Sequence, residues 1–164
     1  MKIKNSILFL LCAFLVVSCD KERVFDEYKS VGNSWHKDSI VSFDLPELNQ
    51  KNKYNLFVTI RDNNDYPFNN LFLIVKMKQP NKQTIVDTLE YQMTEADGSL
   101  LGDGFTDVKE SKLFYKENVA FNLKGKYKVA IQQANRQTGK IVGITNLDGI
   151  SEVGFRIESI TSKE

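Results

Sequence analysis

Apolar and polar residues alternate with a period of two along most of the chain after residue 40, and this pattern constrains the fold more than any other feature. Successive side chains of a β-strand point to opposite faces, so a half-buried strand repeats every second residue, whereas an amphipathic helix repeats about every 3.6 residues. The runs 41–45 and 54–61 alternate most clearly, and no segment shows a convincing helical stripe. The sequence therefore predicts an all-β domain.

Further alternating runs cover residues 71–78, 85–93, 119–123, 127–131 and 153–157, and a short strand is expected at 141–144. Residues typical of turns, such as Pro80-Asn81 and Lys124-Gly125, separate these runs. Residues 95–109 break the pattern with three glycines and several acids, which predicts a long loop with few apolar contacts.

Seven or eight short strands separated by turns favour an antiparallel β-sandwich, in which two sheets bury their apolar faces against each other. The expected core consists of the inward-facing residues of the alternating runs. These are Leu56, Val58, Ile60, Leu73, Val75, Phe121, Val129, Ile131 and Phe155.

The beginning of the chain has the features of a lipoprotein signal peptide. Lys2 and Lys4 precede an apolar run from Ile7 to Val17, which is shorter than the roughly 20 residues that a membrane-spanning helix needs. The residues Val16-Val17-Ser18-Cys19 form a lipobox, so we expect cleavage before Cys19 and acylation of this cysteine. The mature protein would then be attached to a membrane through its acyl chains.

This assignment divides the chain into a signal peptide at 1–18, a tether at 19–33 and a β-sandwich domain at 34–164. The tether is expected because residues 20–33 are rich in charge and have no sustained period. Cys12 leaves with the signal peptide, so no cysteine other than Cys19 remains and a disulfide framework is excluded. The sequence shows neither an amphipathic helix nor a polybasic stretch as a second membrane signal.

The charge balance excludes one class of partner. The whole chain has a formal charge of +1, and loss of Lys2 and Lys4 leaves about −1. Nucleic-acid binding requires a concentrated basic surface, so we expect no nucleic-acid partner.

The residue types for common catalytic and metal sites are scarce. His36 is the single histidine and Cys19 is consumed by lipid, which excludes His/Cys metal sites and leaves any Ser-His-Asp arrangement dependent on His36. A carboxylate pair, or a weak ion site at 62–65 or 97–103, stays open. We predict no catalytic residue, no metal, no cofactor and no small-molecule substrate.

Aromatic residues are the remaining candidates for recognition. Trp35 is expected to plug one end of the core, with stacking on a sugar ring as the alternative. Trp35, His36, Phe114 and Tyr115 are the candidate interaction residues, although burial of the aromatic pair at 114–115 is equally compatible with the pattern.

Several stretches together resemble the GldH family of gliding-motility lipoproteins from Bacteroidetes. They are the lipobox at Cys19, SWHKD at 34–38, YNLFVTIR at 54–61, YPFNNL at 66–71 and GISEVGFRIE at 149–158. The resemblance implies a non-enzymatic, lipid-anchored component of the cell envelope, placed at the outer membrane. It also implies partners among gliding and secretion proteins, including the machinery for type IX secretion and adhesin movement. The only family position that transfers to this chain is the lipid-bearing Cys19.

Two other functions are compatible with the same composition. A glycan-binding lipoprotein of a polysaccharide-uptake system would display a groove of exposed aromatic residues that includes Trp35. An envelope hydrolase would need a carboxylate pair at catalytic separation, which the sequence alone does not reveal.

Overall fold

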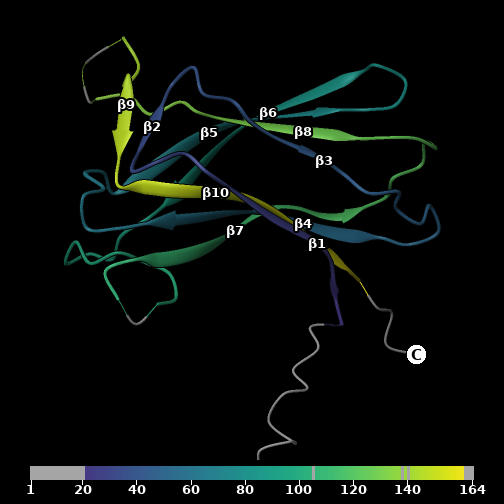
Figure 1. Cartoon of the computed structure of the whole chain (residues 1–164), viewed down its shortest axis with the longest axis horizontal. Coiled ribbons are helices and arrows are strands. Elements are labelled where there is room, and N and C mark those ends of the chain that lie inside the picture. The colour runs from purple at the N-terminus through teal and green to yellow at the C-terminus, as the bar shows by residue number, and fades with distance from the viewer. Residues whose placement is uncertain (1–20, 105, 138, 140, 161–164) are drawn as a thin grey trace, which may run out of the picture.

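The computed structural model describes residues 21–160 except 105, 138 and 140. The predicted signal peptide and Cys19 lie outside this range. The described chain contains ten β-strands and no helix (Figure 1). The all-β prediction is confirmed, with more strands than the seven or eight expected.

Eight of the strands form two four-stranded antiparallel sheets. The first sheet has the order β1 (Arg23–Ser30), β10 (Ile150–Ser159), β4 (Tyr54–Asp62) and β7 (Lys109–Val119). The second has the order β3 (Val41–Asp44), β8 (Lys128–Gln133), β5 (Asn70–Lys78) and β6 (Thr84–Gln92). A short ribbon of β2 (Ser34–His36) and β9 (Asn146–Asp148) lies at one end of the molecule (Figure 1).

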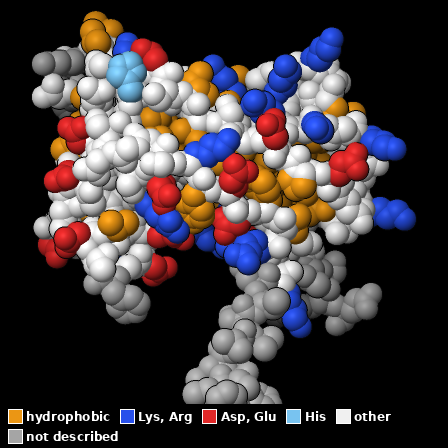
Figure 2. Space-filling view, in the orientation of Figure 1, with side chains coloured by type: hydrophobic (Ala, Val, Ile, Leu, Met, Phe, Trp, Pro, Cys, Tyr) orange, Lys and Arg blue, Asp and Glu red, His pale blue; other side chains and the backbone are white. Residues whose placement is uncertain are grey.

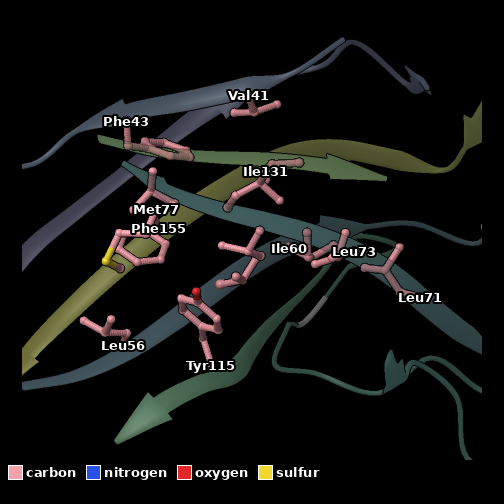
Figure 3. Close-up of a cluster of buried hydrophobic side chains, with 14 of the residues drawn as sticks. Val41, Phe43, Leu56, Ile60, Leu71, Leu73, Met77, Tyr115, Ile131 and Phe155 are labelled. Carbon is pink, nitrogen blue, oxygen red and sulfur yellow. The ribbon is translucent and has the colours of Figure 1, made fainter. Parts of the chain in front are cut away.

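The apolar faces of the two sheets meet in a single core, which confirms the sandwich (Figure 3). Phe43 of β3 and Phe155 of β10 stack across the interior with ring centroids 6.2 Å apart. All nine residues predicted for the core are buried: Leu56, Val58, Ile60, Leu73, Val75, Phe121, Val129, Ile131 and Phe155. Alternation therefore identified the inward face of each long strand correctly.

Hydrogen bonds between the two sheets show which edge strand of the first sheet lies beside which edge strand of the second. On one side, the Lys29 amine of β1 donates to the Ser42 carbonyl of β3 at 2.6 Å. On the other, the Tyr91 hydroxyl of β6 donates to the Phe114 carbonyl of β7 at 2.7 Å. Consequently β1 lies beside β3 at one open edge of the sandwich, and β6 lies beside β7 at the other.

The predicted tether is wrong over Arg23–Ser30, which forms the edge strand β1 paired antiparallel with β10. Two features of β1 explain why its sequence lacks the alternation typical of a strand. A register shift between Arg23 and Phe25 interrupts the strand. Glu27 and Lys29 occupy the positions opposite the inward-facing Phe155 and Val153, so charges replace an apolar row. Inward-pointing charge is a common property of edge strands, because it discourages pairing with another chain.

Two further predictions about strands are wrong. Phe121 and Leu123 lie beyond the end of β7, although Phe121 is buried because its ring packs edge-on against Tyr127 at 4.8 Å. Residues 141–144 do not form a strand, and Ile141 and Val142 are 90% and 74% exposed. The strand of this region is instead β9 (Asn146–Asp148).

The segment between β6 and β7 is a long connection, as predicted, but backbone hydrogen bonds organise it. Leu101 N–H donates to the Met93 carbonyl at 2.8 Å, and Asp103 and Glu110 exchange two bonds of 2.9 Å. A Cβ built at Gly102, whose φ is +106°, would lie 2.7 Å from the Glu110 carbonyl oxygen. Glycine at this position therefore permits the close approach that closes the connection onto β7.

Candidate functional site

Trp35 is fully buried, as expected for a plug at the end of the core. It lies on β2 opposite Leu147 of β9, which is equally buried. Its indole N–H donates to the Ser39 carbonyl at 2.7 Å, so the polar atom of the ring is satisfied without solvent. The ring offers no face on which a sugar or a partner protein could stack.

His36 follows on the same strand, and its side chain is 42% exposed. Its Nδ1 accepts a hydrogen bond from the Asp38 backbone N–H at 3.2 Å, and the Asp38 carboxylate lies 3.8 Å away. These contacts shape the turn that leads from β2 to β3. The imidazole is thus engaged by its own neighbours in the sequence.

Phe114 and Tyr115 are adjacent on β7 and point to opposite faces of the sheet. Tyr115 is 7% exposed, packs against Phe155, and donates its hydroxyl to Asp87 at 2.6 Å. The Lys116 amine approaches the same carboxylate to 2.7 Å. Burial raises the pKa of Asp87, but the bonds from Lys116 and Tyr115 outweigh it and lower the pKa overall. This network ties β6 to β7 and leaves Tyr115 unavailable to a partner.

Phe114 points outward and is 49% exposed. Its ring meets Phe57 of β4 edge-to-face, with centroids 5.7 Å apart. The Lys112 amine lies 4.1 Å from the centroid of the Phe57 ring, a cation–π distance. These three side chains form a small apolar and cationic patch on the outer face of the first sheet.

An ion-pair lattice extends from this patch across the same face. Arg61 of β4 bonds to Glu110 of β7 at 2.8 Å and to Glu152 of β10. The guanidinium also lies over the Tyr28 ring of β1, 4.3 Å from its centroid. The hydrogen bonds to Glu110 and Glu152 raise the pKa of Arg61. Through these bonds and the Tyr28 contact, the Arg61 guanidinium connects all four strands of the sheet.

Gly154 makes this arrangement possible. A Cβ at Gly154 would lie 2.2 Å from the Thr59 hydroxyl oxygen and 2.9 Å from the Tyr28 ring. Any larger residue would displace Tyr28 from the position in which it supports Arg61.

A second set of ion pairs occupies the other half of the face. Arg156 of β10 contacts Asp26 at 2.9 Å and Glu158 at 2.6 Å, and the Lys112 amine contacts Glu158 at 2.6 Å. Burial raises the pKa of Glu158, but its bonds to Lys112 and Arg156 outweigh this effect and lower it. We call this surface the outer face, comprising Asp26, Tyr28, Phe57, Arg61, Glu110, Lys112, Phe114, Glu152, Arg156 and Glu158.

Sequence reasoning identified Phe114 but missed the rest of the outer face. The alternation showed that Phe57 and Arg61 point away from the core. It did not show which residues of β1, β7 and β10 lie beside them, because strand order is a property of the tertiary fold.

The structure also places the acidic stretches that resembled ion sites. Asp62 lies inside the sandwich and Asp65 on the surface, so their carboxylates face different environments. Asp97 accepts from the Ser99 hydroxyl at 2.7 Å in a local turn. Within the described residues, no three His, Cys, Asp or Glu side chains form a group suited to a metal ion. Nor does this part of the chain hold a helix with the length and apolarity needed to cross a bilayer.

The described residues thus form an antiparallel β-sandwich, and one of its sheets carries a charged and aromatic outer face. Residues 23–157 match the model of the GldH lipoprotein family, and the chain belongs to this family. It is 66% identical over 158 residues to "Gliding motility lipoprotein GldH" from Flavobacterium johnsoniae, covering 96% of this chain and 98% of the relative.

A second relative is the "Gliding motility lipoprotein GldH homolog" of Christiangramia forsetii. It is 56% identical over 151 residues, which cover 92% of this chain and 93% of the relative. Both matches extend over nearly the whole of each protein. The family predicted from the sequence is therefore confirmed.

Proposed function

We propose that this chain is a lipid-anchored component of the gliding-motility apparatus and acts in it as a non-enzymatic protein-interaction module. The observation that carries this proposal is the 66% identity, along nearly the full length of both chains, to a protein named for gliding motility. In the proposed role the domain works with the machinery that supports type IX secretion and adhesin movement.

The proposed anchor is acylated Cys19, and the proposed location is the outer membrane. The first strand begins at Arg23, so three residues separate the acylated position from the folded domain. With so short a connection, the acyl chains would hold the sandwich close to the membrane. Attachment through lipid requires no membrane-spanning element from the domain itself.

The outer face is the proposed contact for a protein partner of the apparatus. Phe114 of β7 and Phe57 of β4 present apolar surface on this face, and aromatic residues are frequent among those that dominate binding energy. The surrounding cations already have carboxylate partners at 2.6–2.9 Å within the domain. A partner would therefore gain most from covering the aromatic pair, without having to order these side chains first.

A glycan-binding role receives less support. That hypothesis required Trp35 in an exposed aromatic groove, and Trp35 is fully buried. The same deletion strain tests both roles. Loss of the gene should stop colony spreading while growth on polysaccharides continues, whereas a polysaccharide-uptake protein would show the opposite result.

Complementation of the deletion strain tests the outer face. Phe114→Ala should reduce spreading at an unchanged protein level, because it removes the more exposed ring of the aromatic pair. Val86→Ala is the matched control, since Val86 is 57% exposed on the second sheet. Equal spreading with both variants would show that the outer face is not the contact.

The anchor is tested by mass spectrometry of the N-terminal peptide. Acylated Cys19 is expected at the mature N-terminus, and Cys19→Ala should block both acylation and processing. A free amino terminus on an unmodified Cys19, or cleavage at another bond, would refute the anchor while leaving the fold intact.

A further inference from the structure

The connections at one end of the sandwich come together from distant parts of the sequence. The Gln50 side chain donates to the Asn122 carbonyl at 3.1 Å, which joins the β3–β4 and β7–β8 connections. A Cβ at Gly125 would lie 3.0 Å from Cβ of Pro80, so the β5–β6 turn packs against the same group. The Ser159 N–H donates to the Glu22 carbonyl at 2.7 Å, which places the start of the described chain at this end as well.

We call this the proximal end and define it as residues 21–23, 44–53, 78–84 and 117–128. It carries nine exposed basic side chains: Lys21, Arg23, Lys51, Lys53, Lys78, Lys82, Lys124, Lys126 and Lys128. Its acidic side chains number four: Glu22, Asp44, Glu47 and Glu117. The excess of positive charge is invisible in the sequence, where no long basic run occurs.

The opposite, distal end has the reverse charge. Its connections at 31–40, 62–69, 93–108 and 134–149 expose seven carboxylates: Asp38, Asp65, Glu95, Asp97, Asp103, Asp107 and Asp148. Among the described residues of these connections, the basic side chains are Lys37 and Arg136. Figure 2 shows the blue side chains concentrated at the right-hand end and the red ones more frequent at the left. A nearly neutral chain thus has a strong charge separation along its long axis.

Most basic side chains of the proximal end have no close carboxylate partner among the described residues. Arg23 and Lys128 approach carboxylates only to 3.9 and 3.8 Å. The other seven make no ion pair with any residue that the structure describes. By contrast, Arg61 and Arg156 of the outer face have carboxylates within 2.9 Å. The proximal charges are therefore available to an external anion.

The covalent chain sets the distance between this end and the proposed anchor. Two peptide links join Cys19 to Lys21, so their Cα atoms lie within about 8 Å of each other. That separation is comparable to the screening length of roughly 8 Å at physiological ionic strength. The membrane surface that holds the acyl chains of Cys19 would therefore lie within about one screening length of Lys21.

We propose that the proximal end binds the anionic headgroups of the membrane in which the lipid anchor sits. This inference rests on the proposed anchoring through Cys19 and extends it from attachment to orientation. Attraction of the lysines and repulsion of the distal carboxylates align the long axis with the membrane normal. The acidic distal loops then point away from the lipid, and the outer face stands upright and open to a neighbour in the plane of the membrane.

The test uses the mature, acylated lipoprotein in nanodiscs of phosphatidylethanolamine, with or without phosphatidylglycerol, containing a headgroup-linked fluorescence quencher. Thr84→Cys places a fluorophore at the proximal end, and Ala96→Cys places one at the distal end. Both positions are exposed, and acylation of Cys19 leaves each variant with a single reactive thiol. With phosphatidylglycerol, the probe at 84 should be quenched severalfold more than the probe at 96. High salt should reduce this difference.

Charge reversal provides the matched control. Lys124→Glu with Lys126→Glu should abolish the effect of phosphatidylglycerol on quenching at 84. Lys37→Glu with Arg136→Glu makes the same change in net charge at the distal end. This variant should retain the effect of phosphatidylglycerol on quenching at 84. Equal quenching at 84 and 96, or equal effects of the two reversals, would overturn the orientation even if the protein stays on the nanodiscs. Failure of the protein to co-purify with either nanodisc would overturn the anchoring and the orientation together.

Discussion

Replacement of Asp62 by asparagine should stabilise the domain at neutral and alkaline pH. Asp62 ends β4 and continues its inward-facing row after Ile60. It is fully buried, and neither carboxylate oxygen has a hydrogen-bond partner among the described residues. Ionising an unpaired carboxyl group inside a protein is costly, because the charge loses its hydration without compensation. The asparagine side chain has almost the same shape and carries no charge.

The pKa of Asp62 gives the size and sign of the effect. Burial raises this pKa from 3.8 to about 7. Well below pH 3.8 the carboxyl is protonated in the folded and unfolded states, so there is no penalty. As pH rises, the unfolded state ionises first, and the stability of the folded state falls until the pH passes the folded pKa. Each tenfold change in proton affinity is worth about 1.4 kcal/mol, which sets an upper limit of about 4 kcal/mol above pH 7.

Urea unfolding of residues 20–164 between pH 4 and pH 8 measures this effect, with fluorescence of the single, buried Trp35 as the signal. The advantage of Asp62→Asn in free energy of unfolding should be below about 1 kcal/mol at pH 4, where the unfolded-state carboxyl is only partly ionised. It should reach roughly 2–4 kcal/mol at pH 8. Asp65→Asn removes the same charge from an exposed position and should have little effect at either pH. An advantage for Asp62→Asn that does not change with pH would refute the reasoning.

Three further predictions concern stability and local order. Residues 34–164, which lack β1, should unfold at a lower urea concentration than 20–164, because β10 loses its edge partner; equal midpoints would contradict this. Ile60→Ala should cost about 2–4 kcal/mol of unfolding free energy by opening a cavity, and the exposed Val86→Ala should cost much less. Limited proteolysis should cut first within 95–109, and full amide-exchange protection across 97–104 would argue against it.

The long strands could be predicted from the sequence because each has one buried and one exposed face. Strands β4 and β5 bury every second residue along nearly their whole length, so the pattern was strong. Strand β1 was not predicted, because it lies at an edge and carries charged residues where a central strand carries apolar ones. Strand β9 was not predicted, because three residues are too few to show a period. Phe121 was assigned correctly to the core and wrongly to a strand, since burial does not require regular backbone.

The candidate surfaces were less predictable than the core. Burial of Trp35 at the end of the core was the expected outcome for a single large aromatic residue near the start of the domain. The outer face depends on β1, β10, β4 and β7 being neighbours, although they lie far apart in the sequence. The charge of the proximal end depends on the same folding topology, which brings isolated lysines from four segments to one end. Net charge reports the sum of charges and carries no information about their arrangement.

The two surfaces should differ in their sensitivity to salt, and this follows from how their cations are paired. Arg61 and Arg156 are held by carboxylates of the domain itself, so binding at the outer face would gain chiefly from covering Phe57 and Phe114. Burial of apolar surface does not depend on screening, whereas attraction between unpaired lysines and a membrane weakens as ionic strength rises. Added salt should therefore release the proximal end from the lipid while contact at the outer face persists. A partner complex that dissociates at the salt concentration that abolishes the orientation would place both interactions on the proximal lysines.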